Sequence, residues 1–407
     1  MTHRLYYTDP SLQAFDAEVT RVGRRGDRLT VALDRTAFYP TSGGQPFDTG
    51  TLGGFRVVDV EDQDDGTIEH VLDQGPGTDE EPRPVAQGQT VHGTIDWPRR
   101  FDHMQQHTGQ HVLSAAFDKL FAVRTVSFHL GAEASTIDLA RDVTAAEIEA
   151  AERKANEVVW EDRPVTIRFA DAEEAARLPL RKESAREGTL RLIEVERFDL
   201  SACGGTHVAR TGAIGVIAVA AWERFKGGQR IEFVCGGRAL RRFHSLRDST
   251  AASVRLLSVL PEEVPAAIGR LQTEAKDHKR AAIALQTELA RFRAQELAAG
   301  AERTGVGSLV LRSVDADANG LKSLASAVTS APAHVAVLVS AARPLLIVVS
   351  RSGDVGVSSQ RVVAELISRF GGRGGGKPEL AQAGGLDADA DAVLAAAREI
   401  ITAAPVS

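Results

Sequence analysis

Short runs in which apolar and polar residues alternate dominate the first hundred positions of the chain. Such alternation places every second side chain on one face of an extended strand. Turn-forming residues separate the runs, and many short strands at this spacing are typical of a small barrel. The predicted strands are Phe15–Val22, Leu29–Leu33, Phe55–Val60, Ile68–Leu72 and Thr90–Trp97. We therefore expect an N-terminal β-barrel domain over residues 1–97.

Helical and strand-like periods alternate in the next segment. A helix is predicted from near Pro98 to Phe121, because Val112, Ala116 and Leu120 recur at helical spacing. A second helix is expected at Ala145–Val159, and the remaining elements are strands. These are Thr125–Leu139, Val165–Phe169, Thr189–Val195, Ile214–Ala221 and Gln229–Val234, the last two forming a hairpin. The pattern predicts an α+β domain over residues 98–258.

Residues 259–300 form a different pattern, with apolar positions spaced alternately four and three apart through four heptads. This spacing predicts a coiled-coil arm, which could pair within one chain or between two chains. His278 lies on the apolar seam, where a packing role is expected. The seam consists of Val264, Ile268, Leu271, Ala275, His278, Ala282, Leu285, Leu289 and Phe292.

Strands and helices resume in residues 301–407, in the order βαββα. This order predicts a small C-terminal α/β domain. A glycine-rich segment at 371–376 contains Arg373 and is followed by Lys377. Backbone amides and two cations could bind a phosphate there, although a flexible loop is an equal alternative. The segment lacks the Gly-Lys-Ser/Thr order of a nucleotide P-loop, so ATP is not an expected ligand.

Composition, the N-terminal sequence and net charge limit the class of protein, its location in the cell and its binding to nucleic acids. Apolar residues make up 43% of the 407 residues and charged residues 25%, which is ordinary for a soluble globular protein. The N-terminus lacks a hydrophobic signal region, and no run of 18 apolar residues could span a bilayer, so we expect a cytoplasmic protein without a membrane segment. The net charge of −7 argues against indiscriminate nucleic-acid binding.

Histidines and one cysteine form two motifs suited to a metal ion. His103, His107 and His111 repeat every four residues in the predicted helix, and Cys203 precedes His207 by four. His103 and His111 would lie about 12 Å apart along the axis, so either 103/107 or 107/111 could share an ion, and the spacing leaves both open. The two spacings together are expected by chance roughly 0.015 times in such a chain. Nitrogen and sulfur ligands together favour zinc.

The second cysteine, Cys235, ends a strand-like run and is expected to be a small buried hydrophobic residue. A disulfide between Cys203 and Cys235 is not favoured in a cytosolic setting. A further unusual segment, residues 38–50, contains three glycines and two prolines. Its irregular backbone could approach a ligand, but a tight turn is the commoner role for such a sequence.

Three separated pieces resemble one family. The segments FYPTSGGQPFDTG at 38–50, HMQQHTGQHVLS at 103–114 and CGGTH at 203–207 resemble the editing domain of alanyl-tRNA synthetase and the free-standing alanyl-tRNA editing proteins of the AlaX type. GGRGGGKPELAQAGG at 371–385 resembles the terminal domain of the same synthetase. The resemblance extends over nearly the whole chain and is greatest to the long free-standing form. It implies the pair His107 and His111 as ligands, with His103 as a neighbour.

The resemblance also implies an activity, zinc-dependent hydrolysis of tRNA(Ala) wrongly charged with serine or glycine, with one Zn²⁺ per chain. Thr125 and Ser127 are then the candidates for contact with the substrate serine, and Gly43, Gly44 and Gln45 for the opposite wall. The expected tRNA-binding cations are Arg99, Arg100, Arg224, Lys226, Arg373 and Lys377. No catalytic side chain is assigned beyond a water activated by the metal.

Other hypotheses stay open at this point. The chain could be a tRNA-binding protein with a purely structural zinc, because four protein ligands close a tetrahedral site. Gly43-Gly44-Gln45 is also compatible with peptidyl-tRNA hydrolysis, although three residues are weak support. A homodimer through the coiled-coil arm or the C-terminal domain is a further expectation.

Overall fold

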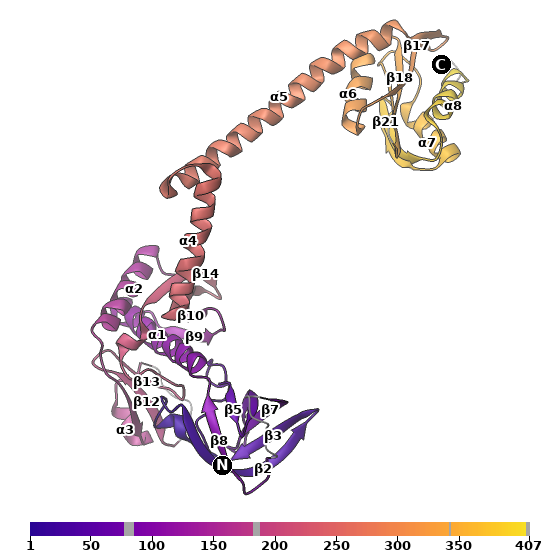
Figure 1. Ribbon diagram of the computed structural model, residues 1–407. Helices are drawn as coiled ribbons and strands as arrows, with labels where there is room; N and C mark the ends of the chain where they lie inside the picture. Colours follow the sequence, from indigo (N-terminus) through magenta and orange to yellow (C-terminus); the bar gives the residue numbers. More distant parts are fainter. Residues whose placement is uncertain (77–84, 182–187, 342, 404–407) are drawn as a thin grey trace. The chain divides into compact units, whose positions relative to one another are not determined.

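The structure is a computed structural model that describes residues 1–76, 85–181, 188–341 and 343–403 (Figure 1). The chain divides into two compact units, Met1–Ala252 and Ser253–Ser407. The boundary between them falls inside helix α4 (Gly237–Leu257). The division into four domains stays a prediction. None of the helices in these residues combines the length and the apolar character needed to cross a membrane.

The first unit begins with the predicted barrel, which is confirmed. The strands close in the order β2-β3-β7-β6-β5-β8 around a core that includes Val19, Val31, Leu33 and Leu72. Strand β8 ends at Ile95, and Trp97 belongs to the following helix. The strands are β2 (Ala14–Arg25), β3 (Arg28–Leu33), β5 (Gly50–Leu52), β6 (Phe55–Asp62), β7 (Ile68–Pro76) and β8 (Thr90–Ile95). Outside the barrel, β1 (His3–Arg4) pairs with β4 (Arg35–Thr36), and η1 (Leu5–Tyr7) lies between them in sequence.

Two sheets follow the barrel. The first has the order β14-β15-β10-β9 and the second β11-β12-β13. The single strand predicted over Thr125–Leu139 is wrong: β9 (Thr125–Leu130) and β10 (Ser135–Leu139) form an antiparallel hairpin, because the chain reverses at residues 131–134. The other strands are β11 (Val165–Ala170), β12 (Leu190–Val195), β13 (Asp199–Ala202), β14 (Ile217–Phe225) and β15 (Gly228–Cys235). The helical segments are α2 (Ala145–Trp160), α3 (Ala172–Arg177) and η2 (Thr211–Ile214).

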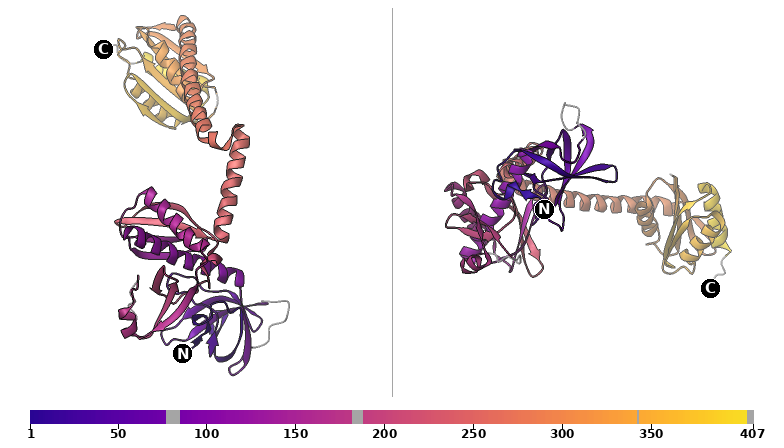
Figure 2. Two further views of the ribbon diagram at one scale, coloured as in Figure 1. Left: turned by 90° about the vertical axis from the view of Figure 1, so that its left-hand side faces the viewer. Right: turned by 90° about the horizontal axis from the view of Figure 1, so that it is seen from below.

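Helix α1 (Trp97–Phe121) occupies the centre of this unit (Figures 1 and 2). Asp96 caps its N-terminus and Pro98 stands in its first turn, where a missing backbone N–H costs nothing. The helix contacts α2, strands of the first sheet, and β13 of the second sheet. Most of its side chains from Arg100 to Phe117 are buried, polar ones included. Side chains on α1 can therefore meet a loop that leaves β13.

The second unit begins with the end of α4, followed by η3 (Pro261–Glu263) and the long helix α5 (Val264–Ala299). A six-stranded sheet with helices on both faces follows α5. This sheet has the order β16-β17-β18-β19-β21-β20. The strands are β16 (Glu302–Thr304), β17 (Gly307–Val314), β18 (His334–Ser340), β19 (Leu345–Arg351), β20 (Arg373–Gly376) and β21 (Leu380–Leu386). The helices are α6 (Ala318–Val328), α7 (Ser359–Phe370) and α8 (Ala390–Thr402). The expected βαββα order is present.

Alternation in β18 explains why helices cover both faces of this sheet. Val335, Val337 and Val339 pack in the core with α7 and α8, whereas Ala336 and Leu338 pack with α6 and the end of α5. The predicted glycine loop is a strand instead: β20 pairs with β21 at the edge of the sheet. Most of the heptad seam on α5 is uncovered, with exposed fractions between 44% and 66% for Ile268, Leu271, Leu285, Leu289 and Phe292.

Candidate metal centre

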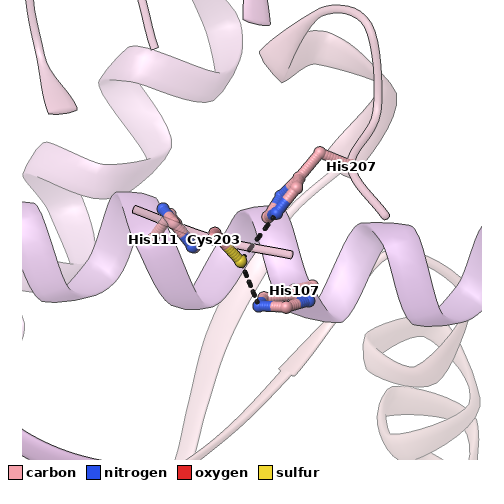
Figure 3. A group of neighbouring side chains, drawn as sticks. All are labelled: His107, His111, Cys203 and His207. Carbon is pink, nitrogen blue, oxygen red and sulfur yellow. Dashed lines mark hydrogen bonds between the residues drawn. The ribbon is translucent and has the colours of Figure 1, made fainter. Parts of the chain in front are cut away.

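Four predicted ligands converge at one point of the first unit (Figure 3). His107 and His111 project from successive turns of α1, and Cys203 and His207 come from the loop after β13. The Cys203 sulfur lies 3.3 Å from His107 Nε2 and 3.4 Å from His207 Nε2. The four ligand atoms all lie within 4.8 Å of one another. His103 is buried outside this group, and its Nδ1 has no hydrogen-bond partner among the described residues.

The other ring nitrogen of His107 is held by a buried amide. His107 Nδ1 lies 2.8 Å from Gln45 Oε1. The Thr206 backbone N–H also donates to that oxygen at 3.1 Å, while Gln45 Nε2 donates to the Thr206 hydroxyl at 2.8 Å. Both bonds identify Oε1 as an acceptor, so His107 must carry its proton on Nδ1. Its Nε2 lone pair is therefore directed at the cluster.

The same argument applies to His207. The Thr108 hydroxyl donates to the Met104 carbonyl at 2.8 Å, so it can only accept from His207 Nδ1 at 3.3 Å. His111 Nδ1 donates to Asp199 Oδ2 at 2.9 Å. Asp199 is also bound by Arg181, whose Nε lies 2.6 Å from Oδ1, and by the Ser201 hydroxyl. All three histidines thus present Nε2, with Nδ1 anchored as in known metal sites.

The two sulfur–nitrogen distances fit a tetrahedral metal ion, and the widest pair of ligand atoms, within 4.8 Å, would have to close further around it. In a tetrahedral zinc site with Zn–S near 2.3 Å and Zn–N near 2.0 Å, sulfur and nitrogen ligands lie about 3.5 Å apart. The two measured sulfur–nitrogen distances, 3.3 and 3.4 Å, are close to that separation. The four residues could therefore hold a metal ion.

The electrostatics favour the metal-binding forms of Cys203 and His207, whereas His111 without a metal is biased towards its charged form. Burial alone would raise the pKa of the Cys203 thiol, but the neighbouring His107 and His207 outweigh it and hold this pKa well below its usual range. Burial lowers the pKa of His207 to about 3. For His111, burial opposes the charged form, yet the hydrogen bond to Asp199 outweighs it and raises the pKa. A thiolate and a neutral imidazole are the forms that bind metal.

The loop between Cys203 and His207 can take this path only with glycine at position 205. A Cβ on Gly205 would lie 2.1 Å from His107 Cε1 and collide with the ring, whereas a Cβ on Gly204 would meet nothing closer than the Tyr7 hydroxyl at 3.5 Å. Arg191 fixes the same loop from β12, donating from Nη1 to the carbonyls of Cys203 at 2.7 Å and Gly205 at 2.9 Å. The ligand loop is thus rigidly supported.

Cys203 lines two cavities of similar size. One, of about 370 Å³ including its opening to solvent, is also lined by His111 and by the predicted substrate residues Thr125 and Ser127. The other, of about 360 Å³, lies on the barrel side and is also lined by His107 and Gly43. The ligand group therefore separates two spaces that could each take part of a substrate.

The glycine pair in the 38–50 segment makes a tight turn. Ser42 and Gln45 exchange two backbone hydrogen bonds, of 3.1 and 2.9 Å, around Gly43 and Gly44, both of which have positive φ. Such a two-residue turn needs left-handed backbone, which glycine adopts freely. Gln45 is fully buried and occupied with His107 and Thr206. Gly44 packs on Phe128. Of the three residues expected on the opposite wall, Gly43 lines the barrel-side cavity, and neither Gly44 nor Gln45 lines either of the two cavities described above.

Comparisons with known proteins agree with this site. Residues 8–99 match the family model described as tRNA synthetases class II (A), residues 190–232 that of the threonyl and alanyl tRNA synthetase second additional domain, and residues 305–403 that of the DHHA1 domain. The chain is 32% identical to the alanyl-tRNA editing protein AlaX-L of Pyrococcus horikoshii, over 94% of both chains. The chain belongs to the AlaX family.

This AlaX protein is also similar to larger enzymes. It is 35% identical to the alanine–tRNA ligase of Natronomonas pharaonis over 98% of its own length, and 33% identical to that of Pyrococcus abyssi over 94%. The chain spans 44% and 42% of those two ligases, less than half their length. The match to the second additional domain includes Cys203 and His207, whereas His107 and His111 lie between the matched segments.

The predicted RNA-binding cations of the AlaX chain differ in accessibility. Arg100 does not fit its predicted role as a tRNA-binding residue. Its side chain is completely buried, paired with Asp48 and bonded to backbone carbonyls, so no tRNA phosphate can reach it. Arg99 is partly buried and donates to the Phe47 carbonyl at 3.1 Å. The remaining four are exposed, namely Arg224, Lys226, Arg373 and Lys377.

Several residues that support the AlaX metal centre were not predicted. Asp199, Ser201 and Cys203 occupy every second position in and just after β13. In an extended strand this spacing places all three side chains on the same face, so the sequence could have indicated them together. Arg191 stands between two apolar residues of β12, Leu190 and Leu192, which is a recognisable signal for a buried structural charge. No sequence pattern marked Thr108, because its hydrogen bond to His207 depends on where the fold places the His207 ring. Cys235 is buried, as predicted.

Proposed function

We propose that this chain is a zinc-dependent aminoacyl-tRNA deacylase that removes serine, and less efficiently glycine, wrongly attached to tRNA(Ala). The AlaX-L relative carries the name of an alanyl-tRNA editing protein, which supports this activity. The observation that carries the proposal is the placement of His107, His111, Cys203 and His207 between two cavities that share Cys203. An ester bond positioned at that point would have its amino acid on one side and its nucleoside on the other.

The ester of an aminoacyl-tRNA is already activated, so hydrolysis mainly requires positioning and stabilisation of developing negative charge. A zinc ion held by the four residues supplies Lewis acidity to an ester carbonyl or to water. Gln45, Thr108 and Asp199 keep the three imidazoles in one tautomer and orientation. The imidazoles are thus oriented before the substrate arrives, and an ion held by all four residues would have to add a coordination position or release one ligand to act on the ester.

Selectivity for serine follows from the hydrogen bonds of Thr125. The Ser114 oxygen accepts from the Thr125 hydroxyl at 2.8 Å and from Gln110 Nε2 at 2.8 Å. The Thr125 proton is thus already used, and its lone pairs can accept a hydrogen bond from the substrate serine hydroxyl. Alanine has no hydroxyl, and a site built to bond a hydroxyl discriminates strongly against a substrate without one. Ser127 is bound to Asp138 and lines the same cavity.

Contacts with the tRNA body are assigned to exposed cations. Arg224 and Lys226 lie in and after β14 of the first unit, and Arg373 and Lys377 lie in and after the edge strand β20 of the second. Arg99 stays a candidate with partial exposure. The exposed heptad seam of α5 supports a homodimer through the arm, because the described part of the same chain leaves its apolar side chains about half uncovered.

The deciding experiment offers zinc-loaded protein Ser-tRNA(Ala), Gly-tRNA(Ala) and Ala-tRNA(Ala), with and without a chelator. Serine should be released fastest, glycine, which lacks the hydroxyl that Thr125 would bind, much more slowly, and alanine should stay attached. Chelation should abolish the release and zinc addition should restore it. His111→Ala should lose activity, whereas His129→Ala, an exposed histidine on β9, should keep it. The proposal would be contradicted if serine were released at the same rate with and without the chelator and by the His111→Ala variant.

A second function has one observation in its favour. Four protein ligands complete a tetrahedral site, which is the pattern of structural zinc, so the chain could be a tRNA-binding protein without hydrolytic activity. In that case chelation would lower thermal stability and tRNA binding together, and no serine would be released at any zinc concentration. Peptidyl-tRNA hydrolysis loses its support, because the Gln45 side chain is occupied by His107 and Thr206.

A further inference from the structure

The barrel-side cavity contains an unusual concentration of aromatic residues. The chain has three tyrosines, and all of them, Tyr6, Tyr7 and Tyr39, line this cavity together with Arg4. We call this group of four residues the tyrosine pocket. The Tyr6 ring packs edge to face against both other rings, with centroids 5.2 Å apart in each pair. Cys203 and His107 close the end of the pocket next to the metal centre.

One polar group in the tyrosine pocket is unmatched. Tyr6 is 1% exposed, and its hydroxyl has no hydrogen-bond partner among the described residues. The other two hydroxyls are engaged: Tyr39 donates to the Ser42 carbonyl at 3.0 Å, and Tyr7 accepts from Arg4 Nη1 at 3.3 Å. Buried hydroxyls are nearly always bonded, so an unmatched one that lines a cavity next to a reactive centre points to a ligand atom.

Positive charge flanks the same pocket. The guanidinium groups of Arg4 and Arg191 lie 5.5 and 5.3 Å from the centre of the Tyr7 ring. Arg191 is buried, and its Nη2 has no hydrogen-bond partner among the described residues. Arg4 is partly exposed and binds Asp62 at 2.7 Å. Aromatic faces beside guanidinium groups form the environment in which proteins hold unpaired bases and their phosphates.

We propose that the tyrosine pocket binds the terminal adenosine of the tRNA, with the Tyr6 hydroxyl bonded to a polar edge of the nucleoside and Arg4 near its phosphate. The inference rests on the proposed function. The ester joins the amino acid to the ribose of that nucleotide, so the two groups must lie on opposite sides of the reacting carbonyl. The cavity with Thr125 and Ser127 offers hydroxyl contacts for serine. In the tyrosine pocket Tyr6 and Tyr39 are buried, and Tyr7, the one partly exposed ring of the three, offers stacking for a base.

A binding experiment can test the pocket without any hydrolysis. Full-length zinc-loaded protein carrying 3-fluorotyrosine has its three fluorine labels only in this pocket, and Tyr→Phe variants assign each ¹⁹F resonance. Adenosine 5′-monophosphate should shift the resonances, and Tyr6→Phe should weaken its affinity at least ten-fold. Trp160→Phe, which changes an exposed aromatic residue, should leave that affinity unchanged. The proposal is overturned if adenosine monophosphate shifts no resonance, or if serine methyl ester shifts them instead.

A kinetic comparison separates this inference from the proposed function. Wild-type protein should hydrolyse the seryl ester of adenosine with a much lower KM than serine methyl ester, and Tyr6→Phe should reduce this preference at least ten-fold. Binding of adenosine monophosphate without hydrolysis of either ester would support the pocket and overturn the deacylase function. Equal KM values for the two esters, with both hydrolysed, would overturn the pocket and support the function.

Discussion

Asp199 holds one of the four candidate metal ligands, His111, without itself belonging to the ligand group. Its carboxylate accepts from His111 Nδ1 at 2.9 Å and is held by Arg181. Burial alone would raise the pKa of Asp199, but the bond from His111 and the charge of Arg181 outweigh it and lower this pKa, so the group stays ionised. Loss of such a carboxylate typically lowers metal affinity 10- to 100-fold.

Asp199→Asn should therefore weaken zinc affinity by about 10- to 100-fold, because a neutral amide polarises the His111 ring less. Competition with a chromophoric chelator measures this affinity directly. Asp16→Asn is a matched control, since Asp16 makes the same kind of bond to His92 at 2.8 Å but both side chains are exposed. Equal zinc affinities for the two variants would show that the Asp199 bond has no influence on the metal.

The four candidate metal ligands could be predicted from sequence, whereas the pairing of each histidine with its support could not, even where spacing places a support such as Asp199 on the right face. His107 and His111 share a helix face by local geometry, and Cys203 and His207 lie four residues apart in one loop. Their partners come from elsewhere: Gln45 from a turn next to the barrel and Asp199 from β13. Hydrogen bonds over such sequence distances depend on how sheets and helix pack, which spacing does not encode.

His70 gives the barrel a pH-dependent stability. It is fully buried, bonded to the Thr36 hydroxyl at 2.8 Å and the Val31 carbonyl at 3.0 Å. Burial lowers the pKa of His70 to about 4. In the unfolded chain the pKa is about 6.5, so between these values the unfolded state binds more protons. The free energy of unfolding must therefore fall as pH decreases from about 6.5 towards 4.

His70→Gln removes this titration while keeping polar groups for both partners. The stability advantage of the wild type over His70→Gln should shrink by about 2 kcal/mol between pH 7 and pH 5. Urea denaturation of both proteins at the two pH values measures it. His3→Gln, a change at an exposed position, should follow the wild type. A constant difference between wild type and His70→Gln would mean that His70 is not neutral in the folded protein.

At the scale of elements, a buried ion pair joins α1 to the barrel loop. The Arg100 and Asp48 side chains have no exposed surface, and Asp48 also accepts from the Tyr39 backbone N–H at 2.6 Å. Removing one partner of such a pair leaves an uncompensated buried charge and typically costs about 3–5 kcal/mol. The pair holds the 38–48 segment, and with it the turn that presents Gln45 to His107.

Arg100→Met should lower the free energy of unfolding by about 3–5 kcal/mol. Adding Asp48→Asn should recover part of the loss, because it removes the unpaired charge and keeps a carbonyl for Tyr39. Arg25→Met serves as control: its pair with Glu61 on the barrel is 47% and 36% exposed, so the loss should stay within about 1 kcal/mol. Denaturant titrations rank the variants, and a loss of similar size for Arg100 and Arg25 would contradict the structural role.

Elements with a long, regular period were predictable, and short or glycine-rich ones were not. Ile68–Pro76 and Ala145–Trp160 agree with their patterns within a few residues. Strand β5, Gly50–Leu52, is too short for alternation to register, although it closes the barrel between β6 and β8. Strand β20 is three-quarters glycine, which sequence propensity assigns to a loop. Backbone pairing with β21 holds β20 in the extended conformation, which its glycine residues do not favour by themselves.

Across the whole molecule, the proposed chemistry and one set of proposed RNA contacts lie in different units. The metal centre and both cavities belong to Met1–Ala252, whereas Arg373 and Lys377 belong to Ser253–Ser407. Both cations are exposed, and they lie in and just after β20, at one edge of the sheet. We therefore expect these two cations to bind phosphate on the tRNA body.

Replacement of both cations should therefore act on binding. Arg373→Ala/Lys377→Ala should raise KM for Ser-tRNA(Ala) several-fold and reduce the slope of log affinity against log salt concentration by about one for each lost phosphate contact. Filter binding over a salt series and steady-state deacylation measure the two quantities. Arg303→Ala is the matched control, because Arg303 is exposed on β16 at the opposite edge of the same sheet. If the Arg303 variant changed the salt slope as much as the double variant, non-specific charge rather than the β20 edge would account for tRNA binding.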